Sequence, residues 1–365
     1  MEPRDTRVTQ SLHCWIRHGM MSRGPLQVLR ESQRTRRLLT LALASSGFYL
    51  GCRALAAKLL SAMLYHPFRY KDDPRHDRMV REFREAFNTM SYQLQEVDYV
   101  LRTGSGSDGL AQRAFLVQPK APPTGGLWIV FGGNAMVGTD WFDFCWSMLA
   151  SLPTGAERPA FLLMDYPGYG ANSGTPSPGT VLRAQLSGLR ATLPHLAAFP
   201  GKLHLLGHSL GAAAAAQLAA SLRQEASGKL GQQLDCEATK LISALAPGRL
   251  VLSAPFLNID AMAQEIFGAR VLPSWLLRIL LTERWNNAAW VPQAAEAGWD
   301  VHIIHGTQDE IVPTRMGKTL ADSLKTKGYK CSFVEVRGAG HNDLLNAAQQ
   351  RYAVLMGFKA AAAAL

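Results

Sequence analysis

The chain has 365 residues, enough for one domain of roughly 250–300 residues with an extension, or for two smaller domains. Its 47% hydrophobic and 18% charged composition is that of a globular protein and excludes a disordered chain. The formal net charge is +10, but residues 1–37 alone contribute +5, with eight Arg against three acidic residues. This concentration, together with the lack of zinc-finger spacing, RNP-like motifs or a basic stripe, excludes nucleic acid as a partner and favours targeting or an anionic membrane surface.

An apolar segment follows the basic residues 1–37. Leu38–Cys52 is the longest uncharged run, and at 15 residues it is shorter than the ~20 that cross a bilayer. It extends to about Tyr65 if Arg53 and Lys58 snorkel. We predict a membrane-anchor or targeting segment over 38–65. Four interpretations stay open: a signal anchor with its basic side in the cytosol, a cleaved mitochondrial or plastid transit peptide, an interfacial amphipathic helix, and a helix packed on the domain's own surface in a cytoplasmic protein.

Basic and acidic residues alternate after Pro67, and this pattern predicts a solvated linker helix over 66–92. The main domain is then 93–365. The whole chain has five cysteines, which are scattered and never form CxxC, and HEXXH is absent. We therefore expect no disulfide framework and no metal site. His302 and His305 fit buried structural imidazoles.

Short apolar runs predict the strands of the main domain, and helix-compatible stretches separate most of them. This pattern indicates an α/β fold, with a mostly parallel central sheet covered by helices on both faces. The carboxyl ends of its parallel strands then share one edge, where ligands bind. We expect a surface insertion at 224–236 and a frayed tail at 360–364. The predicted strands are 93–101, 110–117, 127–131, 161–164, 203–206, 250–254, 301–305 and 333–336.

The five residues 207–211 read GHSLG and lie between the strand 203–206 and an alanine-rich helix. Gly-x-Ser-x-Gly in this context predicts a turn so tight that side chains at 207 and 211 would clash across it. Such a turn lifts the Ser209 hydroxyl above the sheet edge, over a helix N-terminus that favours a developing anion. The alternative is an ordinary N-cap serine. We expect His208 to pack under the turn.

A serine nucleophile needs a base, and the base needs an orienting acid. Asp309 follows the strand 301–305, and His341 lies in a glycine-rich loop after the strand 333–336. The order Ser, Asp, His is the one expected for this architecture. Glu310 and Asp343 are neighbouring carboxylates that we consider less suitable as the acid.

An oxyanion hole needs two donors, and the amide of Leu210 is the first candidate. The strand 127–131 is followed by Gly132–Gly133, which lets the backbone turn so that the Asn134 amide faces the site. We therefore predict Asn134 and Leu210 as the oxyanion donors.

Over roughly residues 93–358, the chain resembles the α/β-hydrolase superfamily. It is most similar to membrane-anchored α/β-hydrolase-domain proteins, which include lysophospholipid and monoacylglycerol lipases and protein depalmitoylases. Many relatives have His-Gly where this chain has Gly132–Gly133. Asp165 is expected to fix its own loop. The resemblance rests on GGNA (132–135), DYPGYGANSGTPS (165–177), GHSLG (207–211), SAPFLNID (253–260), HGTQDEIVP (305–313) and GAGHND (338–343).

The resemblance implies a serine hydrolase that cleaves an ester or thioester through an acyl-enzyme, with Ser209, His341 and Asp309 as the triad. The mechanism needs neither metal nor organic cofactor. We expect a small apolar helical cap within 256–290. That region, with Met136 and residues 141–146, is a candidate acyl pocket, with core packing as the alternative. A lipid or acylated substrate at a membrane surface is the expected partner. The alternatives are a non-catalytic scaffold on a hydrolase fold and a soluble esterase or peptidase, and the oligomeric state is left open.

Overall fold

The computed structural model describes residues 47–51, 54–55, 58, 62, 64–70, 73–102, 109–196, 201–226, 244–267 and 284–359. The predicted basic segment 1–37, most of 38–65 and of 224–236, and the tail 360–364 lie outside these residues. The chain divides into two compact units, Met1–Lys58 and Leu59–Leu365. The described residues of the first unit are helical, and Phe48, Tyr49, Leu50 and Leu55 are exposed. A search of the described residues finds no helix with the length and apolarity needed to cross a membrane.

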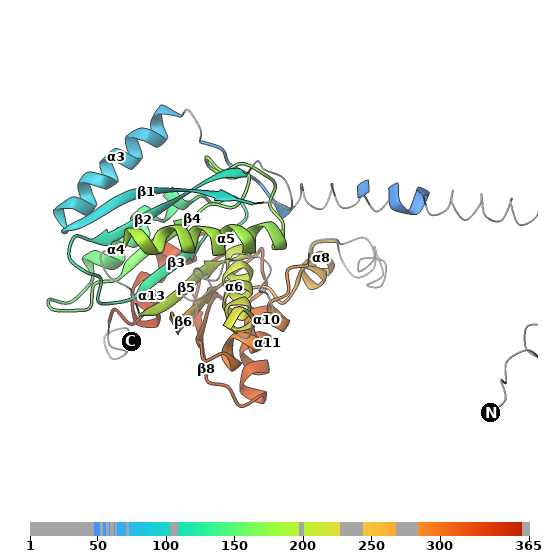
Figure 1. Ribbon diagram of the computed structural model, residues 1–365. Helices are drawn as coiled ribbons and strands as arrows, with labels where there is room; N and C mark the ends of the chain where they lie inside the picture. Colours follow the sequence, from blue (N-terminus) through green and yellow to red (C-terminus); the bar gives the residue numbers. More distant parts are fainter. Residues whose placement is uncertain are drawn as a thin grey trace, which may run out of the picture. The chain divides into compact units, whose positions relative to one another are not determined.

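The second unit is built on one eight-stranded sheet, in the order β1-β2-β4-β3-β5-β6-β7-β8 (Figure 1). β1 and β2 pair antiparallel, β2 and β4 pair antiparallel, and every later pairing is parallel. Each of the eight predicted strands is found, so the predicted fold class is confirmed. The bounds are β1 Tyr92–Leu101, β2 Leu110–Pro119, β3 Leu127–Phe131, β4 Ala160–Met164, β5 Lys202–His208, β6 Ala246–Ser253, β7 Asp300–Gly306 and β8 Cys331–Val336.

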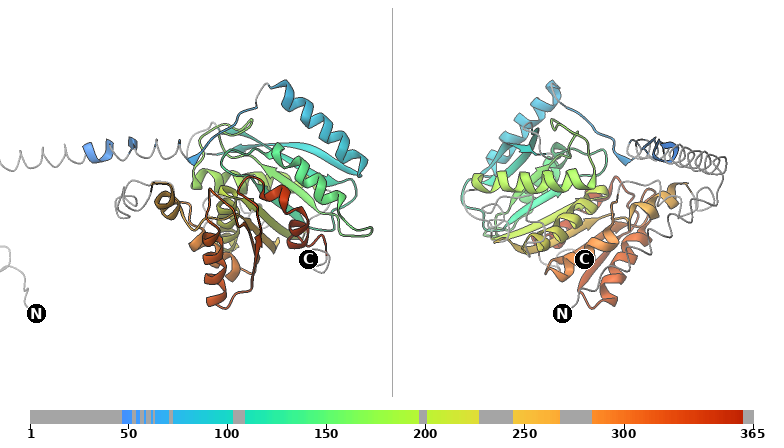
Figure 2. Two further views of the ribbon diagram at one scale, coloured as in Figure 1. Left: turned by 180° about the vertical axis from the view of Figure 1, so that it is seen from behind. Right: turned by 45° about the vertical axis from the view of Figure 1, so that its right-hand side comes forward.

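Helices cover both faces of this sheet. α5, α6, α10 and α11 lie in a row on one face, and α4 and α13 contact each other on the opposite face (Figures 1 and 2). The bounds are α3 Pro74–Thr89, η1 Gly138–Trp141, α4 Phe142–Ala150, α5 Pro178–Thr192, η2 Leu193–His195, α6 Leu210–Ala226, α8 Ile259–Phe267, α10 Asn287–Glu296, α11 Thr314–Thr326, α12 Leu344–Ala347 and α13 Gln349–Leu355.

The core lies between these layers. All residues of β3 and β4 are buried, which explains why these strands read as continuous apolar runs rather than as alternating patterns. Strand β5 ends at His208 next to the end of β3, where Phe131 pairs with Gly207. The central strands therefore deliver the GHSLG turn and the GGNA loop to the same edge of the sheet.

The helix predicted over 66–92 is found as α3, but it is not a solvated linker. It begins after Asp73, whose side chain accepts a hydrogen bond from the Arg75 amide, and it packs on β1 and α4. Val80 and Phe87 are buried and Phe83 is partly buried, at the three- and four-residue spacing of an amphipathic helix. The alternating charges occupy the solvent side of this helix, and its apolar stripe joins the core.

The predicted apolar cap lies partly outside the described residues. Helix α8 covers its first part, and Met262 and Ala263 of that helix are buried. Residues 268–283 are not described, and the chain is described again from residue 284, where Trp285 is fully buried.

Candidate active site

The GHSLG turn joins β5 directly to α6. Ser209 has a φ of 56°, in the left-handed region that L-residues rarely adopt. A Cβ on Gly207 would lie 2.0 Å from the Gly211 carbonyl oxygen, and a Cβ on Gly211 would lie 2.2 Å from the Phe131 carbonyl oxygen. Only hydrogen fits at these two positions, so the expected tight turn is present.

The backbone of Ser209 is fixed from the neighbouring strand. Its amide donates to the carbonyl oxygen of Ser253, the last residue of β6, at 2.8 Å. Helix α6 starts at the next residue, Leu210, so the amides of its first turn point toward the strand edge that carries the serine. The hydroxyl therefore stands at the positive end of a helix dipole, where negative charge is stabilised.

Asp309 and His341 are brought together from two different loops. Asp309 follows β7 and His341 follows β8, and His341 Nδ1 donates to Asp309 Oδ2 at 2.8 Å. The two side chains are 0% and 5% exposed, so water does not compete for this hydrogen bond. The loops are also joined through their backbones, since the Gln308 amide donates to the Ala339 carbonyl at 2.9 Å.

Four groups donate to the Asp309 carboxylate. Oδ1 accepts from the amides of Ile311 and Val312, and Oδ2 accepts from His341 Nδ1 and, at 3.2 Å, from His305 Nε2. Burial by itself raises the pKa of Asp309, but the hydrogen bonds from His305 and His341 outweigh it and hold the pKa well below its usual value. The carboxylate is therefore ionised at neutral pH.

The two neighbouring carboxylates bind backbone amides instead. Glu310 Oε2 accepts from the amide of His341 at 3.4 Å, and Asp343 Oδ1 accepts from the amide of Gly340 at 2.7 Å. The geometry thus separates Asp309, which meets the imidazole ring, from the two acids that shape the loop around it.

The ring of His341 lies against the GHSLG turn. Its centroid is 4.9 Å from that of His208, the residue that precedes the predicted nucleophile. In the described part of the chain, no hydrogen bond joins the Ser209 hydroxyl to His341. Hydrogen bonds of catalytic groups are often long in unliganded sites and tighten when substrate binds, so this arm of the triad stays a prediction.

His208 packs under the turn as expected, within a buried polar network. Its Nδ1 is hydrogen-bonded to the Ser253 hydroxyl at 2.9 Å, and that hydroxyl is hydrogen-bonded to the Tyr352 hydroxyl at 2.5 Å. Burial, reinforced by the nearby His341, lowers the pKa of His208 to about 3, so its ring is neutral at neutral pH.

The predicted oxyanion loop faces the same turn. A Cβ on Gly133 would lie 3.7 Å from the Cβ of Ser209, which places this backbone directly beside the serine. Neither the Asn134 amide nor the Leu210 amide donates to an acceptor among the described residues. Both N–H groups are therefore available to a ligand, although their role as oxyanion donors is still a prediction.

The family model of the alpha/beta hydrolase family matches residues 126–354, which is more than half of the chain. The chain belongs to this family. The match contains β3 to β8 and the loops that carry Ser209, Asp309 and His341.

Two curated relatives of this hydrolase come from Mycobacterium tuberculosis. They are Uncharacterized protein Rv2307c of strain H37Rv and Uncharacterized protein MT2364 of strain CDC 1551. Each is 29% identical over 183 residues, which are 50% of this chain and 53% of the relative. The match thus spans about half the length of these relatives.

Two solved esterase structures are similar to the chain. The Pyrococcus furiosus esterase Pf2001 has a TM-score of 0.50 and 12% sequence identity, covering 74% of this chain and 92% of its own. A thermophilic esterase from the planctomycete Thermogutta terrifontis has a TM-score of 0.47 and 20% identity, covering 72% and 93%. At this identity, the likeness to Pf2001 establishes the fold and nothing further.

Part of the candidate acyl pocket of this hydrolase is core. Phe142 is fully buried and meets Phe115 edge-on, and Phe144 is 5% exposed and meets Tyr352 edge-on. These two residues of 141–146 therefore fill the space between α4 and its neighbours, as the core-packing alternative expected. Met136 is partly buried beside the oxyanion loop, and Trp146 is 40% exposed.

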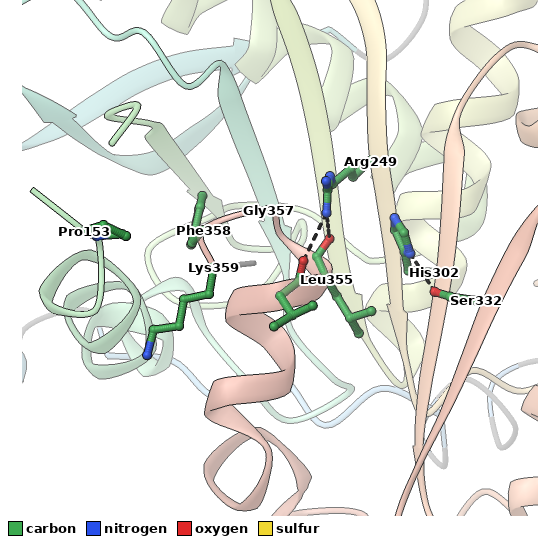
Figure 3. Close-up of a pocket in the computed structure, with 9 residues that line it drawn as sticks. Pro153, Arg249, His302, Ser332, Leu355, Gly357, Phe358 and Lys359 are labelled. Carbon is green, nitrogen blue, oxygen red and sulfur yellow. Dashed lines mark hydrogen bonds between the residues drawn. The ribbon is translucent and has the colours of Figure 1, made fainter. Parts of the chain in front are cut away.

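A hollow of about 560 Å³ is lined in part by Arg249, His302 and Ser332, from the amino-terminal halves of β6, β7 and β8 (Figure 3). Ser209 instead follows the carboxyl end of β5. Its main polar groups are already bonded to the protein: Arg249 donates to the carbonyls of Val354 and Leu355, and His302 is bonded to Ser332. We therefore assign this hollow no part in the chemistry proposed for Ser209, Asp309 and His341. Among the described residues, no group of three or more His, Cys, Asp or Glu side chains is placed to hold a metal ion.

Sequence reasoning missed several residues around this site. His305 was expected only as a buried imidazole, yet it shares the Asp309 carboxylate with His341. Tyr166 and Tyr169 of the DYPGYG motif donate to the carbonyls of Gly132 and Asn134 in the oxyanion loop. The motif itself was the only available signal, because nothing in its spacing indicates which loop its hydroxyls reach.

Proposed function

We propose that the protein is a serine hydrolase that cleaves a carboxylic ester or thioester through Ser209, His341 and Asp309. One observation carries the proposal: a serine held at a positive φ on a strand-to-helix turn lies beside a buried, hydrogen-bonded His–Asp pair. Each part has a separate structural explanation, but together they are the components of an activated alcohol.

In the acylation step, His341 Nε2 takes the proton of Ser209 as the oxygen attacks the substrate carbonyl carbon. The ionised Asp309 holds Nδ1–H and stabilises the imidazolium that forms. The amides of Asn134 and Leu210 donate to the oxyanion. His341 then gives its proton to the leaving alcohol or thiol, and the acyl group remains on Ser209.

In the deacylation step, water takes the place of the leaving group. His341 accepts a proton from the water, the hydroxide oxygen attacks the acyl carbon, and the carboxylic acid leaves as the proton returns to Ser209. No oxidant, metal or carrier enters either step.

A lipid or lipidated substrate is the finer part of the proposal. The resemblance to membrane-anchored lipases and depalmitoylases supports it, as do the exposed apolar residues Phe48, Leu50 and Leu55 of the N-terminal helical stretch. Near the candidate site, Phe68 and Ile311 are also exposed, and Ile311 lies two residues after Asp309. Apolar side chains of this kind suit contact with acyl chains or a bilayer surface.

Labelling with a fluorophosphonate probe tests the serine chemistry. The full-length protein should form a covalent adduct and hydrolyse p-nitrophenyl butyrate, and Ser209→Ala should lose both, with a rate loss of up to ~10⁶. Ser147→Ala, at a partly exposed serine of α4, is the matched control and should behave as wild type. A folded protein without a Ser209-dependent adduct would favour the non-catalytic scaffold.

The substrate class is tested by comparing acylglycerols, lysophospholipids and palmitoylated peptides with short soluble esters. A higher kcat/KM on one of the lipidic classes supports the proposal, and activity confined to soluble esters or peptides favours the alternative. Flotation of the full-length protein with vesicles of phosphatidylcholine and phosphatidylserine tests membrane contact. Phe48→Asp/Leu50→Asp should reduce flotation, and Val100→Asp, at an exposed apolar residue of β1, should not.

A further inference from the structure

In the loop that carries the Asn134 amide, the carbonyls of Gly132, Gly133 and Asn134 all accept hydrogen bonds. The Gly132 carbonyl accepts from the Tyr166 hydroxyl at 2.5 Å, and the Gly133 carbonyl accepts from the Met136 amide at 3.2 Å. The Asn134 carbonyl accepts from the Tyr169 hydroxyl at 2.6 Å and from the His66 amide at 3.0 Å. Two of these donors are tyrosine hydroxyls from one distant loop.

These hydrogen bonds fix the peptide groups around the Asn134 amide, which donates to no acceptor among the described residues. The Asn134 N–H lies in one planar peptide group with the Gly133 carbonyl, which accepts from the Met136 amide, and two further peptide groups flank it. Tyr166 holds the plane of the Gly132 carbonyl, and Tyr169 holds the plane of the Asn134 carbonyl. Rotation of the peptide between them would break the Gly133–Met136 hydrogen bond, and a shift of either flanking peptide would break a tyrosine contact.

The two tyrosines are themselves firmly placed. Tyr166 is 3% exposed and Tyr169 is fully buried, and their rings pack edge to face with centroids 5.3 Å apart. Burial raises the pKa of both hydroxyls, so both remain protonated donors. A Cβ on Gly170 would lie 2.2 Å from Asp165 Oδ2, which explains why the loop turns here with a glycine at positive φ.

The segment 65–70 is hydrogen-bonded to the same two loops. Besides the His66 amide on Asn134, the Phe68 carbonyl accepts from the Gly170 amide at 2.8 Å, and the Tyr70 hydroxyl donates to Asp165 at 2.6 Å. Asp165 in turn accepts from the amide of Gly138, just beyond the oxyanion loop. The DYPGYG loop is thus hydrogen-bonded both to segment 65–70 and to the GGNA loop.

We propose that Tyr166 and Tyr169 are positioning residues, which aim the Asn134 amide at the oxyanion by holding the carbonyls of Gly132 and Asn134. The inference rests on the proposed function. The tyrosines do not touch the substrate, so their removal lowers kcat, where the oxyanion is formed, and leaves ground-state binding largely intact.

The test uses Tyr166→Phe and Tyr169→Phe in the full-length chain, with p-nitrophenyl butyrate as substrate. Deleting an oxyanion donor outright costs ~10²–10³ in rate, so misaiming it should lower kcat by ~10–100-fold with KM changed less than ~3-fold. Tyr99→Phe is the matched control and should keep wild-type kcat, because that buried hydroxyl has no partner among the described residues. 3-Fluorotyrosine at 169, which keeps the ring and the donor, should restore most of the lost kcat.

The proposal is overturned if both phenylalanine variants match Tyr99→Phe in kcat, or if their loss lies in KM instead. Tyr169→Phe decides alone if Tyr166→Phe does not fold, since its hydrogen bond ends on the carbonyl of the partly exposed Asn134. Wild-type turnover that depends on Ser209, with unaffected tyrosine variants, would refute this inference and leave the proposed function standing. A wild-type protein with no Ser209-dependent turnover would refute both.

Discussion

His341 Nδ1 lies 2.8 Å from Asp309 Oδ2, and the same oxygen lies 3.2 Å from Nε2 of His305. One carboxylate therefore orients two imidazoles, of which only His341 stands against the GHSLG turn. His305 is fully buried and also donates to the Val312 carbonyl at 2.8 Å, so it holds the loop on which Asp309 sits.

Asp309→Asn should leave the fold intact and abolish most of the activity. The amide has nearly the shape of the carboxylate, but it carries no charge to stabilise the imidazolium, and its NH₂ group can favour the wrong tautomer of His341. We expect kcat for p-nitrophenyl butyrate to fall by ~10⁴. Asp343→Asn, at the neighbouring acid that binds only a backbone amide, should lose far less. Equal losses in the two variants would contradict the assignment of Asp309.

The glycines of the turn should tolerate no side chain. In Gly211→Ala, the new Cβ would lie 2.2 Å from the Phe131 carbonyl oxygen, so α6 and β3 would have to move apart. Overpacking of this kind costs ~1–3 kcal/mol, measured as the free energy of unfolding in urea. The control is Gly179→Ala in α5, where the Cβ meets only the Arg183 guanidinium at 3.8 Å. It should be neutral or stabilising by up to ~1 kcal/mol, and a similar loss there would argue against the steric explanation.

Acid should destabilise the protein partly through His208. Its pKa of about 3 in the folded state lies below the ~6.5 of an unfolded chain, so between these pH values the unfolded state binds the extra proton. Stability should then be fully present above pH ~6.5 and fall as the pH decreases, by at most ~1.4 kcal/mol per pH unit from this residue. His341, Asp309 and His305 are the titratable groups that act on this ring.

The measurement is urea unfolding of wild type and His208→Asn between pH 7 and pH 4.5. The variant should be less stable at pH 7 but should show a shallower pH dependence. The slope should be reduced rather than abolished, because burial also lowers the pKa of His204 to about 4. Identical slopes in both proteins would show that His208 does not stay neutral.

The segment before α3 should contribute to stability through Tyr65. Trp285 Nε1 donates to the Tyr65 hydroxyl at 2.8 Å, and both side chains are buried. Tyr65→Phe leaves the indole N–H without this acceptor, which should cost ~1–3 kcal/mol of unfolding free energy. Tyr99→Phe, which removes a hydroxyl with no partner among the described residues, should cost clearly less. If both variants unfold at the same urea concentration, the Tyr65–Trp285 contact is not stabilising.

Local pattern was enough to predict the sheet. Continuous apolar runs such as LWIVF and FLLM identify strands buried on both faces, because a parallel sheet between two helical layers needs no polar side. The GHSLG turn was equally readable, since the clash that excludes a side chain at Gly207 and Gly211 arises within a few residues of chain. The charge alternation of α3 led to the prediction of a solvated linker, because charge on one side of a helix says little about the apolar stripe on the other. That stripe consists of Val80, Phe83 and Phe87.

From its residue types and their order alone, the chain determined which strands form and which residues stand at their carboxyl ends. The sequence already favoured Asp309 over Glu310 and Asp343 as the acid. Only the tertiary structure decided that its carboxylate reaches the His341 ring and that the Tyr166 and Tyr169 hydroxyls reach the GGNA loop. The physical reason is the separation along the chain over which each kind of interaction acts. Propensity and steric limits act between neighbours in sequence. The His341–Asp309, Tyr166–Gly132 and Tyr169–Asn134 hydrogen bonds instead join residues 32, 34 and 35 positions apart, which only the packing of the strands brings together.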